Sequence, residues 1–276
     1  MKKGIMEEFF IHNGKVLVSD GKELSFDSSV KVIYEVVRVI DGIPLFWEEH
    51  MDRLLRSAKL LQADASGVVE PITRDTRKVI ELNEAPEKNL KVLLYNLNNP
   101  VPDYYVFFIK SFYPSQELYR NGIKAITCEA MRDNPHIKII NKEFRETVDR
   151  SLQQCDAYEA LLLNDKGEIT EGSRSNVLFV KDGVVYTPHS KDVLLGTTRA
   201  HILGICKDLG VKVVEKSINY EFLKECDGLF ITGTSPKVLP ISQVDDIDFA
   251  STKNGVILGI MKAFDRLIED YIESHR

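Results

Sequence analysis

A chain of 276 residues, with 43% hydrophobic and 28% charged side chains, has the size and composition of a globular protein with one large domain or two ordinary ones. Its net charge of −6 argues against non-specific binding to nucleic acid. It has no run of about 18 apolar residues, so the sequence predicts no membrane span. Residues 1–4 are basic, but Glu7 and Glu8 follow without a long apolar segment, so we expect no secretory signal.

The cysteines are too widely spaced for a zinc site or a disulfide framework. None of the four belongs to a C-x-x-C pair, the spacing that many zinc sites use. They are Cys128, Cys155, Cys206 and Cys226. This pattern favours buried thiols in a cytoplasmic protein without a bound metal.

The first 112 residues predict an α+β domain with a mostly antiparallel sheet. Residues 9–17 surround an Asn13-Gly14 pair, which is typical of a tight hairpin turn. Residues 30–40 are rich in β-branched side chains and predict a strand that turns back at Asp41-Gly42. Apolar side chains at helical spacing then predict a helix; they are Met51, Leu54, Leu55, Ala58 and Leu61. The other elements expected here are a helix at 74–82 and strands at 90–97 and 104–110.

Residues 113–122 interrupt the periodic pattern and predict an interdomain linker. They contain a proline and turn-forming residues without a steady period, so we expect domains at 1–112 and 123–276. The second domain also predicts a mixture of helices and strands. The expected strands are 123–128, 160–163, 177–180, 211–218 and 229–232, and the expected helices are 142–154, 198–209, 220–226 and much of 255–275.

One hairpin and one lysine carry the main chemical signal. The segment Glu168–Asn176 reads E-I-T-E-G-S-R-S-N between two apolar runs, which places Glu171 and small polar residues on a short loop. Lys138 lies among isoleucines in the segment I-K-I-I-N. An amine with the ordinary lysine pKa of about 10.4 is a poor nucleophile at neutral pH, so burial or nearby positive charge must lower that pKa. Taken singly, a solvated lysine and an exposed hairpin glutamate would account for both residues.

Together these segments resemble the active-site core of the class IV aminotransferases, the pyridoxal-phosphate (PLP) enzymes of fold type IV. Lys138 to Asn141 is similar to the family's Lys-x-x-Asn, and Glu171 to Asn176 reads as its E-G-S-x-S-N. The resemblance implies that Lys138 forms the Schiff base with PLP, with Lys142 as the rival lysine. It also implies that Glu171 keeps the pyridine nitrogen protonated.

Further motifs in the expected order complete the implied cofactor site. His50 to Leu54 is similar to the family's His-x-x-Arg-Leu and implies Arg53 as a phosphate ligand, because a guanidinium offers several donors in a fixed fork. Gly196 to Arg199 resembles Gly-Ile-Thr-Arg at the start of a helix, where the first backbone N–H groups bind anions. The implied cofactor ligands are Arg53, Glu171, Ser173, Arg174, Ser175, Thr197, Thr198 and Thr234, and Tyr34 is implied to face the substrate.

The resemblance implies a two-domain α+β homodimer of PLP fold type IV with its cofactor in the interdomain cleft. The implied reaction moves an amino group between an amino acid and a 2-oxo acid such as 2-oxoglutarate, with branched-chain L-amino acids as the first donors to consider. Two alternatives stay open. One is an aminodeoxychorismate lyase, which releases pyruvate and 4-aminobenzoate, and the other is a PLP-binding protein without turnover.

The chain also departs from the family pattern, which leaves the donor, the acceptor and the stereopreference open. Residues 26–30 replace a Gly-rich F-G-D-G segment, and Asn96 lies near the position where several members carry an arginine. No pair matches the arginine and histidine that bind the carboxylate in the D-amino-acid enzymes. Lys142 stands where branched-chain members often have tyrosine, and residues 134–136, N-P-H, resemble the aminodeoxychorismate lyases.

Overall fold

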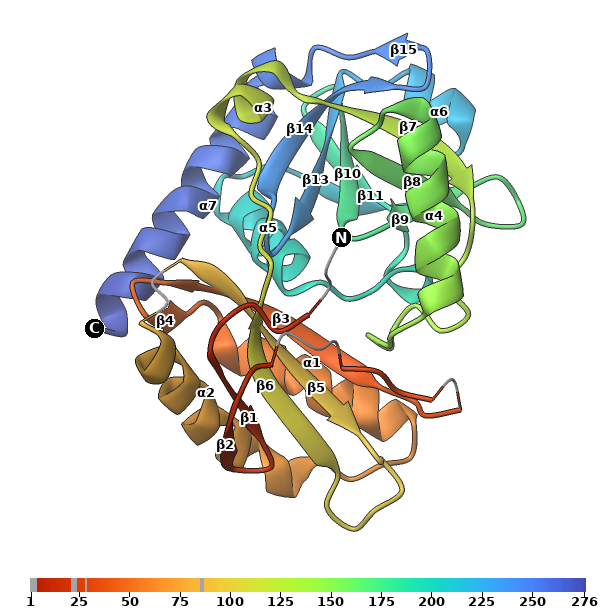
Figure 1. The fold of residues 1–276 in the computed structure, drawn as a ribbon. Helices are drawn as coiled ribbons and strands as arrows, with labels where there is room; N and C mark the ends of the chain where they lie inside the picture. Colours follow the sequence, from red (N-terminus) through yellow and green to blue (C-terminus); the bar gives the residue numbers. More distant parts are fainter. Residues whose placement is uncertain (1–3, 21–23, 28, 85–86) are drawn as a thin grey trace. The chain divides into compact units, whose positions relative to one another are not determined.

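The computed structural model describes residues 4–20, 24–27, 29–84 and 87–276 (Figure 1). The basic residues 1–3, and Ser28 in the segment that replaces the Gly-rich loop, lie outside the described residues. The chain forms two compact units, each of which contains both helices and strands. Unit 1 consists of Met1–Phe112, Ile137–Ile140 and Ile268–Arg276, and unit 2 consists of Tyr113–His136 and Asn141–Leu267.

The segment that carries Lys138 belongs to unit 1, whereas the expected boundaries placed it in the second domain. Its backbone explains the difference. The Tyr34 N–H donates to the carbonyl of Lys138, and the Ile140 N–H donates to the carbonyl of Val32, both at 2.9 Å. Ile139 forms an isolated antiparallel bridge with Ile33. Residues 137–140 are therefore attached to the unit 1 sheet by hydrogen bonds that the local sequence does not reveal.

Unit 1 has a six-stranded sheet in the order β2-β1-β6-β5-β3-β4, and neighbouring strands in its described residues pair antiparallel. The mostly antiparallel sheet that the sequence predicted is present. Its strands are β1 (Phe9–His12), β2 (Lys15–Val18), β3 (Ile33–Ile40), β4 (Ile43–Pro44), β5 (Lys88–Tyr95) and β6 (Asp103–Ile109). Along β3, buried and half-buried residues alternate, so Ile33, Glu35 and Val37 share one face and Tyr34 lies on the other.

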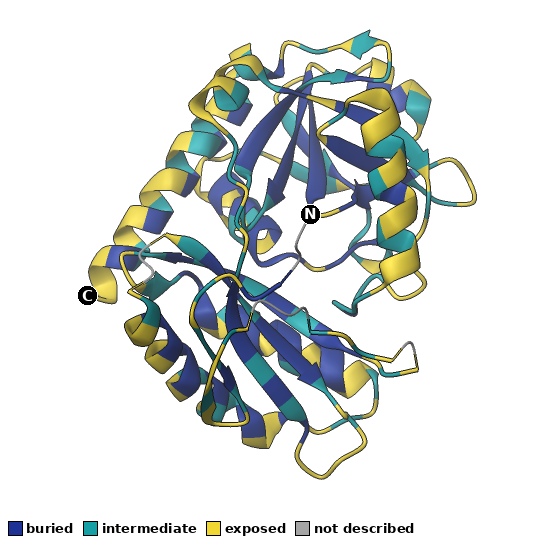
Figure 2. Cartoon of the chain, in the orientation of Figure 1, coloured by how far each residue is buried: buried dark blue, intermediate teal, exposed yellow. Residues whose placement is uncertain are grey.

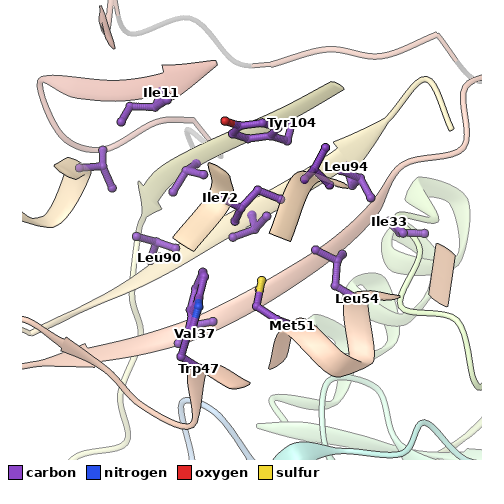
Figure 3. Close-up of a cluster of buried hydrophobic side chains, with 14 of the residues drawn as sticks. Ile11, Ile33, Val37, Trp47, Met51, Leu54, Ile72, Leu90, Leu94 and Tyr104 are labelled. Carbon is purple, nitrogen blue, oxygen red and sulfur yellow. The ribbon is translucent and has the colours of Figure 1, made fainter. Parts of the chain in front are cut away.

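The core of unit 1 lies between that sheet and the helices α1 (Trp47–Leu60) and α2 (Val69–Asn83), which a short 3-10 turn, η1 (Ser66–Val68), connects. Figure 3 shows Met51 and Leu54 of α1 and Ile72 of α2 among the side chains of the sheet. In α1 the acidic Glu48 and Glu49 lie in the first turn, where they complement the helix dipole. The apolar stripe read from the sequence is thus the face that α1 buries.

Unit 2 has a nine-stranded mixed sheet with the path β12-β11-β10-β13-β14-β7-β8-β9, and β15 pairs with β14. The parallel pairs are β7 with β8, β7 with β14, and β11 with β12. The strands are β7 (Ile123–Glu129), β8 (Glu159–Leu163), β9 (Ile169–Gly172), β10 (Asn176–Lys181), β11 (Val184–Thr187), β12 (Val213–Glu215), β13 (Gly228–Gly233), β14 (Lys237–Val244) and β15 (Ile247–Asp248). The helices are α3 (Gln116–Asn121), α4 (Lys142–Cys155), α5 (Thr197–Asp208), α6 (Tyr220–Lys224) and α7 (Gly255–Ser274), with 3-10 turns η2 (Ser190–Asp192) and η3 (Ser251–Lys253). From Ile268 onward, α7 belongs to unit 1.

Two elements of unit 2 differ from the expectation. The predicted linker contains the helix α3, which begins after Ser115, whose side chain accepts from the Leu118 N–H, and ends at Gly122 with a φ of 77°. The strand β14 lies in the middle of the sheet, although no strand was expected there. It contains Pro240, which pairs with Phe230 of β13, and a proline within a run argues against a central strand.

The central strands of unit 2 are buried, whereas its helix α4 is mostly exposed. Figure 2 shows buried residues along β10 and β13, while most of α4 is exposed. The buried polar residues of β8 and β10 are Glu159 and Asn176. No helix of the described residues combines the length and apolarity needed to cross a lipid bilayer.

Candidate active site

Lys138 lies against an aromatic ring in unit 1. Its Nζ is 4.9 Å from the centroid of the Tyr34 ring, and the Nζ of Lys91 is 4.7 Å from the same centroid. Lys138 is half-buried, whereas the rival Lys142 is exposed at the start of α4. The side chain of Asn141 accepts from the Phe144 N–H, so the asparagine of the motif caps that helix. The ammonium groups of Lys138 and Lys91 therefore both lie against the Tyr34 ring. Of the two candidate Schiff-base lysines, Lys138 is more shielded from solvent than Lys142.

Arg53 of α1 pairs with a fully buried carboxylate of β3. Its Nε donates to Glu35 Oε1 at 2.7 Å and its Nη2 to Glu35 Oε2 at 2.6 Å, and Arg53 itself is 5% exposed. His50 Nδ1 lies 2.8 Å from Glu35 Oε2. Burial alone raises the pKa of Glu35, but the charge and hydrogen bonds of Arg53, helped by His50, outweigh it and lower that pKa to about 2.

The same environment acts on His50 and on Arg53. Burial lowers the pKa of His50 and outweighs the opposing influence of Glu35. Burial also disfavours the charged form of Arg53, but the Glu35 carboxylate outweighs it and raises that pKa. Arg53 thus stays charged at neutral pH.

Glu171 lies within β9 of unit 2 rather than on the loop that the sequence predicted. It is 3% exposed, and its Oε2 accepts from the Leu194 N–H at 3.2 Å. Arg132 Nε lies 2.9 Å from Glu171 Oε1, but its N–H is not aimed at an acceptor, so the contact is an ion pair without a directed hydrogen bond. A buried carboxylate is thereby held in one place by a backbone amide and a guanidinium.

Arg132 and Arg145 converge on the residue next to this strand. Each donates from its Nη2 to the carbonyl of Ser173 at 2.8 Å. Their guanidinium carbons lie 5.2 and 5.8 Å from the centroid of the Phe144 ring. The sequence analysis identified neither arginine. The only signal available was their position close to Lys138 on either side, and no spacing rule turns that position into a contact with Glu171.

The other residues of the E-G-S-x-S-N motif have partners of their own. The hydroxyls of Ser173 and Ser175 donate to the buried carboxylate of Glu159, at 2.6 and 2.7 Å. Arg174 donates to Asp149 at 2.6 Å with a side chain that is 62% exposed. In the described structure the two serines therefore hold the hairpin together, and Arg174 forms a surface ion pair.

The start of α5 has the features of an anion site. No side chain caps this helix, no acidic residue lies in its first turn, and Thr197 and Thr198 are buried. A Cβ on Gly196 would lie 2.1 Å from Asn176 Oδ1, so only glycine fits there. Arg199, the last residue of the motif, donates to Thr187 and Glu215 and so connects α5 to the sheet.

Thr234 lies half-buried in the turn after β13. On the same strand, Thr232 Oγ1 is buried and has no hydrogen-bond partner, which is uncommon for a buried hydroxyl. Thr232 pairs with Asn176, the residue whose side chain lies beside Gly196. An uncapped helix start and an unsatisfied hydroxyl are what a phosphate group would use, so the donor set of unit 2 fits PLP.

The carboxylates and thiols give no sign of a metal centre. Among the residues that the structure describes, no group of three His, Cys, Asp or Glu side chains could hold a metal ion. All four cysteines are free thiols, and burial raises the pKa of Cys206 to about 11 and that of Cys226 to about 12. Those two thiols are therefore unreactive at neutral pH.

Comparison with known proteins identifies the family. The family model for amino-transferase class IV matches residues 32–244. The chain is 30% identical over 224 residues to the D-alanine aminotransferase of Bacillus licheniformis, covering 77% of this chain and 78% of the relative. It is 29% identical to that of Staphylococcus aureus strain COL, covering 98% and 99%. It is also 30% identical to a putative branched-chain-amino-acid aminotransferase of Methanocaldococcus jannaschii, covering 84% and 86%.

Solved structures agree on the fold. The branched-chain amino acid aminotransferase of Escherichia coli superposes with a TM-score of 0.84 at 24% identity and covers 95% of both chains. A putative 4-amino-4-deoxychorismate lyase of Legionella pneumophila superposes with a TM-score of 0.78 at 19% identity, covering 85% of this chain and 90% of that one. These likenesses confirm the predicted α+β architecture of fold type IV. The chain belongs to the class IV aminotransferases, and it is a PLP-dependent transaminase as its motifs predicted.

Proposed function

We propose that this protein transfers an amino group from a branched-chain L-amino acid to a 2-oxo acid such as 2-oxoglutarate, with PLP bound to Lys138. The observation that carries the proposal is the half-buried Lys138 Nζ above the Tyr34 ring, in a chain of the class IV family. PLP, when bound, supplies an electron sink for the negative charge that develops at the substrate Cα. Lys138 then takes the proton from Cα and returns it, as general base and general acid.

The other proposed roles divide into ring and phosphate contacts. The fixed carboxylate of Glu171 keeps the pyridine nitrogen protonated, because an opposite charge favours the protonated form. Ser173, Arg174 and Ser175 are assigned to the same wall of the site, although their side chains bind Glu159 and Asp149 in the described structure. Tyr34 faces the substrate. The proposed phosphate ligands are Arg53, Thr197, Thr198 and Thr234.

The choice of amino donor is the finer part of the proposal, and the relatives include both D-alanine and branched-chain aminotransferases. The absence of the arginine and histidine pair of the D-amino-acid enzymes favours an L-amino acid. Asn96, which lies near the position where several members have an arginine, donates to Asp103 at 2.6 Å in an exposed turn. An asparagine at this position is uncharged, so it cannot form an ion pair with a D-amino-acid carboxylate as an arginine would.

Single-turnover spectroscopy tests the proposal. The PLP-loaded protein is mixed with L-leucine, L-isoleucine, L-valine or D-alanine, and the absorbance of the bound cofactor is followed. Conversion to the pyridoxamine form with the L-amino acids is the expected result. Conversion with D-alanine alone would refute the donor and keep the reaction class. Pyruvate release from aminodeoxychorismate without an amino acceptor would indicate the lyase, and no change with any compound would indicate a binder without turnover.

We also propose that the protein is a homodimer and acts in the cytoplasm. The family resemblance supports the first, and the four free thiols support the second, since reduced cysteines suit a reducing compartment. Sedimentation equilibrium tests the dimer directly. A mass equal to that of one chain, 31.4 kDa, at micromolar concentration would contradict it.

A further inference from the structure

Glu159 is a buried carboxylate to which neither the family motifs nor the proposed mechanism gives a role. It is the first residue of β8 and is 4% exposed. Charged residues are rarely that buried unless a partner holds them. In the part of the chain that the structure describes, no ion pair joins Glu159 to a lysine or arginine, so its partners are hydrogen-bond donors.

The donors belong to the hairpin that carries Glu171. Glu159 Oε1 accepts from the Ser173 hydroxyl at 2.6 Å and shares the Ser173 N–H, at 3.0 Å, with the carbonyl of Ala160, at 2.8 Å. Glu159 Oε2 accepts from the Ser175 hydroxyl at 2.7 Å, and Oε1 also accepts from the Ala160 N–H at 2.9 Å. Both oxygens of one carboxylate are therefore occupied by the segment that follows Glu171.

The backbone of the hairpin is closed tightly around this carboxylate. A Cβ on Gly172 would lie 2.1 Å from Ser175 Oγ and 3.1 Å from Glu159 Oε2. Any larger residue at position 172 would displace the serine from the carboxylate. Gly172 directly follows Glu171. The position that has no room for a side chain is therefore next to the residue proposed to bind the pyridine nitrogen.

Ser173 also connects Glu159 to the arginines at Glu171. Its N–H and hydroxyl bind Glu159, while its carbonyl accepts from the Nη2 groups of Arg132 and Arg145, each at 2.8 Å. Arg132 in turn lies 2.9 Å from Glu171 Oε1. The position of Ser173 therefore sets the position of the guanidinium beside Glu171. A displacement of Ser173 reaches Glu171 both through the backbone and through Arg132.

We propose that Glu159 is a positioning residue that holds the Glu171 carboxylate in place for the cofactor ring by accepting hydrogen bonds from Ser173 and Ser175. The proposal rests on the proposed function of Glu171. Glu159 acts through the length of its side chain, which brings two acceptor atoms to the serines, and not through its negative charge. Misplacement of a reacting or stabilising group by about 1 Å costs up to about 100-fold in rate.

Two substitutions separate reach from charge. Glu159→Gln keeps the length and loses the charge; its amide oxygen can accept from Ser173, and its amide NH₂ can donate to the Ser175 hydroxyl, which also accepts. Glu159→Asp keeps the charge but withdraws it by one methylene. We expect Glu159→Gln to react with an amino acid within about threefold of wild type, and Glu159→Asp to react about 10- to 100-fold more slowly. Glu168→Gln, in the turn of the same hairpin and bound to Asn164, is the matched control and should match wild type.

Two further readouts are independent of turnover. In the apo-protein, backbone hydrogen exchange of residues 169–176 should be faster in Glu159→Asp and unchanged in Glu159→Gln. In the PLP-loaded protein, the visible band of Glu159→Asp should shift toward that of Glu171→Gln. The affinity for PLP should change less than about threefold, because the proposed phosphate ligands lie on other elements.

A double substitution shows whether Glu159 acts through Glu171. If it does, adding Glu159→Asp to Glu171→Gln should slow the half-reaction by less than about threefold further, because residues that act as a unit are not additive. Full multiplication of the two effects would overturn the proposal. So would a Glu159→Gln rate as low as that of Glu159→Asp, or a wild-type rate for Glu159→Asp. A wild-type rate for Glu171→Gln alone would instead refute the proposed role of Glu171, while the hydrogen-exchange result would still report on the hairpin.

Discussion

Replacing Arg53 by alanine should destabilise unit 1 strongly at neutral pH. The substitution removes two donors, at 2.7 and 2.6 Å, from a Glu35 carboxylate that is 0% exposed. Of the side chains that contact this carboxylate in the described structure, His50, at 2.8 Å, would remain. Removing one partner of a buried ion pair typically costs about 3–5 kcal/mol, because the other charge stays in a medium that solvates it poorly.

The lowered pKa of Glu35 gives a second value for the free energy by which its partners stabilise the folded state. Burial raises this pKa, but Arg53 and His50 outweigh burial and lower it from 4.5 to about 2. At about 1.4 kcal/mol per pH unit, that lowering stabilises the folded state by about 3 kcal/mol. Because the folded pKa is depressed, this stability is present above about pH 4.5 and is lost as the pH falls toward 2. The difference between wild type and Arg53→Ala should therefore shrink in that window.

Urea denaturation of the apo-protein measures the effect. Trp47 is the only tryptophan of the chain and lies buried at the start of α1, so its fluorescence reports the unfolding of unit 1. The matched control is Arg74→Ala, which removes an arginine 68% exposed and 3.7 Å from Asp75, and should cost less than about 1 kcal/mol. The reasoning fails if Arg53→Ala unfolds within about 1 kcal/mol of wild type at pH 7, or if the difference is the same at pH 3.5.

The remaining predictions concern the cofactor. Borohydride should fix PLP to Lys138, and peptide mapping that finds the label on Lys142 would overturn the assignment. Arg53→Ala should also weaken PLP binding by about 1.5–3 kcal/mol, measured by titration, if the guanidinium binds the phosphate; an unchanged dissociation constant would exclude that role. Glu171→Gln should keep PLP bound but slow the half-reaction with an amino acid by about 10²–10³-fold in stopped-flow absorbance; a rate within about threefold of wild type would reduce Glu171 to a structural residue. Gly196→Ala, whose new Cβ would lie 2.1 Å from a neighbouring amide oxygen, should lower the affinity for PLP with little change in the half-reaction at saturating PLP.

The sequence by itself determined most of the elements and the chemical class of the site. Helical spacing of apolar residues predicted α1, and the Asn13-Gly14 pair predicted the first hairpin. Periodicity of this kind is local, because the period of side-chain burial follows directly from the geometry of a helix or strand. The motifs around Glu171 and Lys138 led to the class IV family and to PLP, which the family match confirms.

Tertiary structure alone decided the partners of the polar groups and the position of two segments. Pro240 argues against a strand locally, yet β14 forms because β7 and β13 lie on either side of it. The segment with Lys138 belongs to unit 1 because backbone groups of β3 bind it across about a hundred residues of sequence.

The hairpin that carries Glu171 shows the same limit within the site. The letters E-G-S-R-S-N named Glu171, but they could not show that Arg132 would lie beside it or that Glu159 would bind the two serines. A buried charge or hydroxyl needs a hydrogen-bonding or ionic partner, but the local sequence does not show which residue will be that partner. Which residue meets that need depends on which strands and helices pack together, and this is settled only when the sheet has formed.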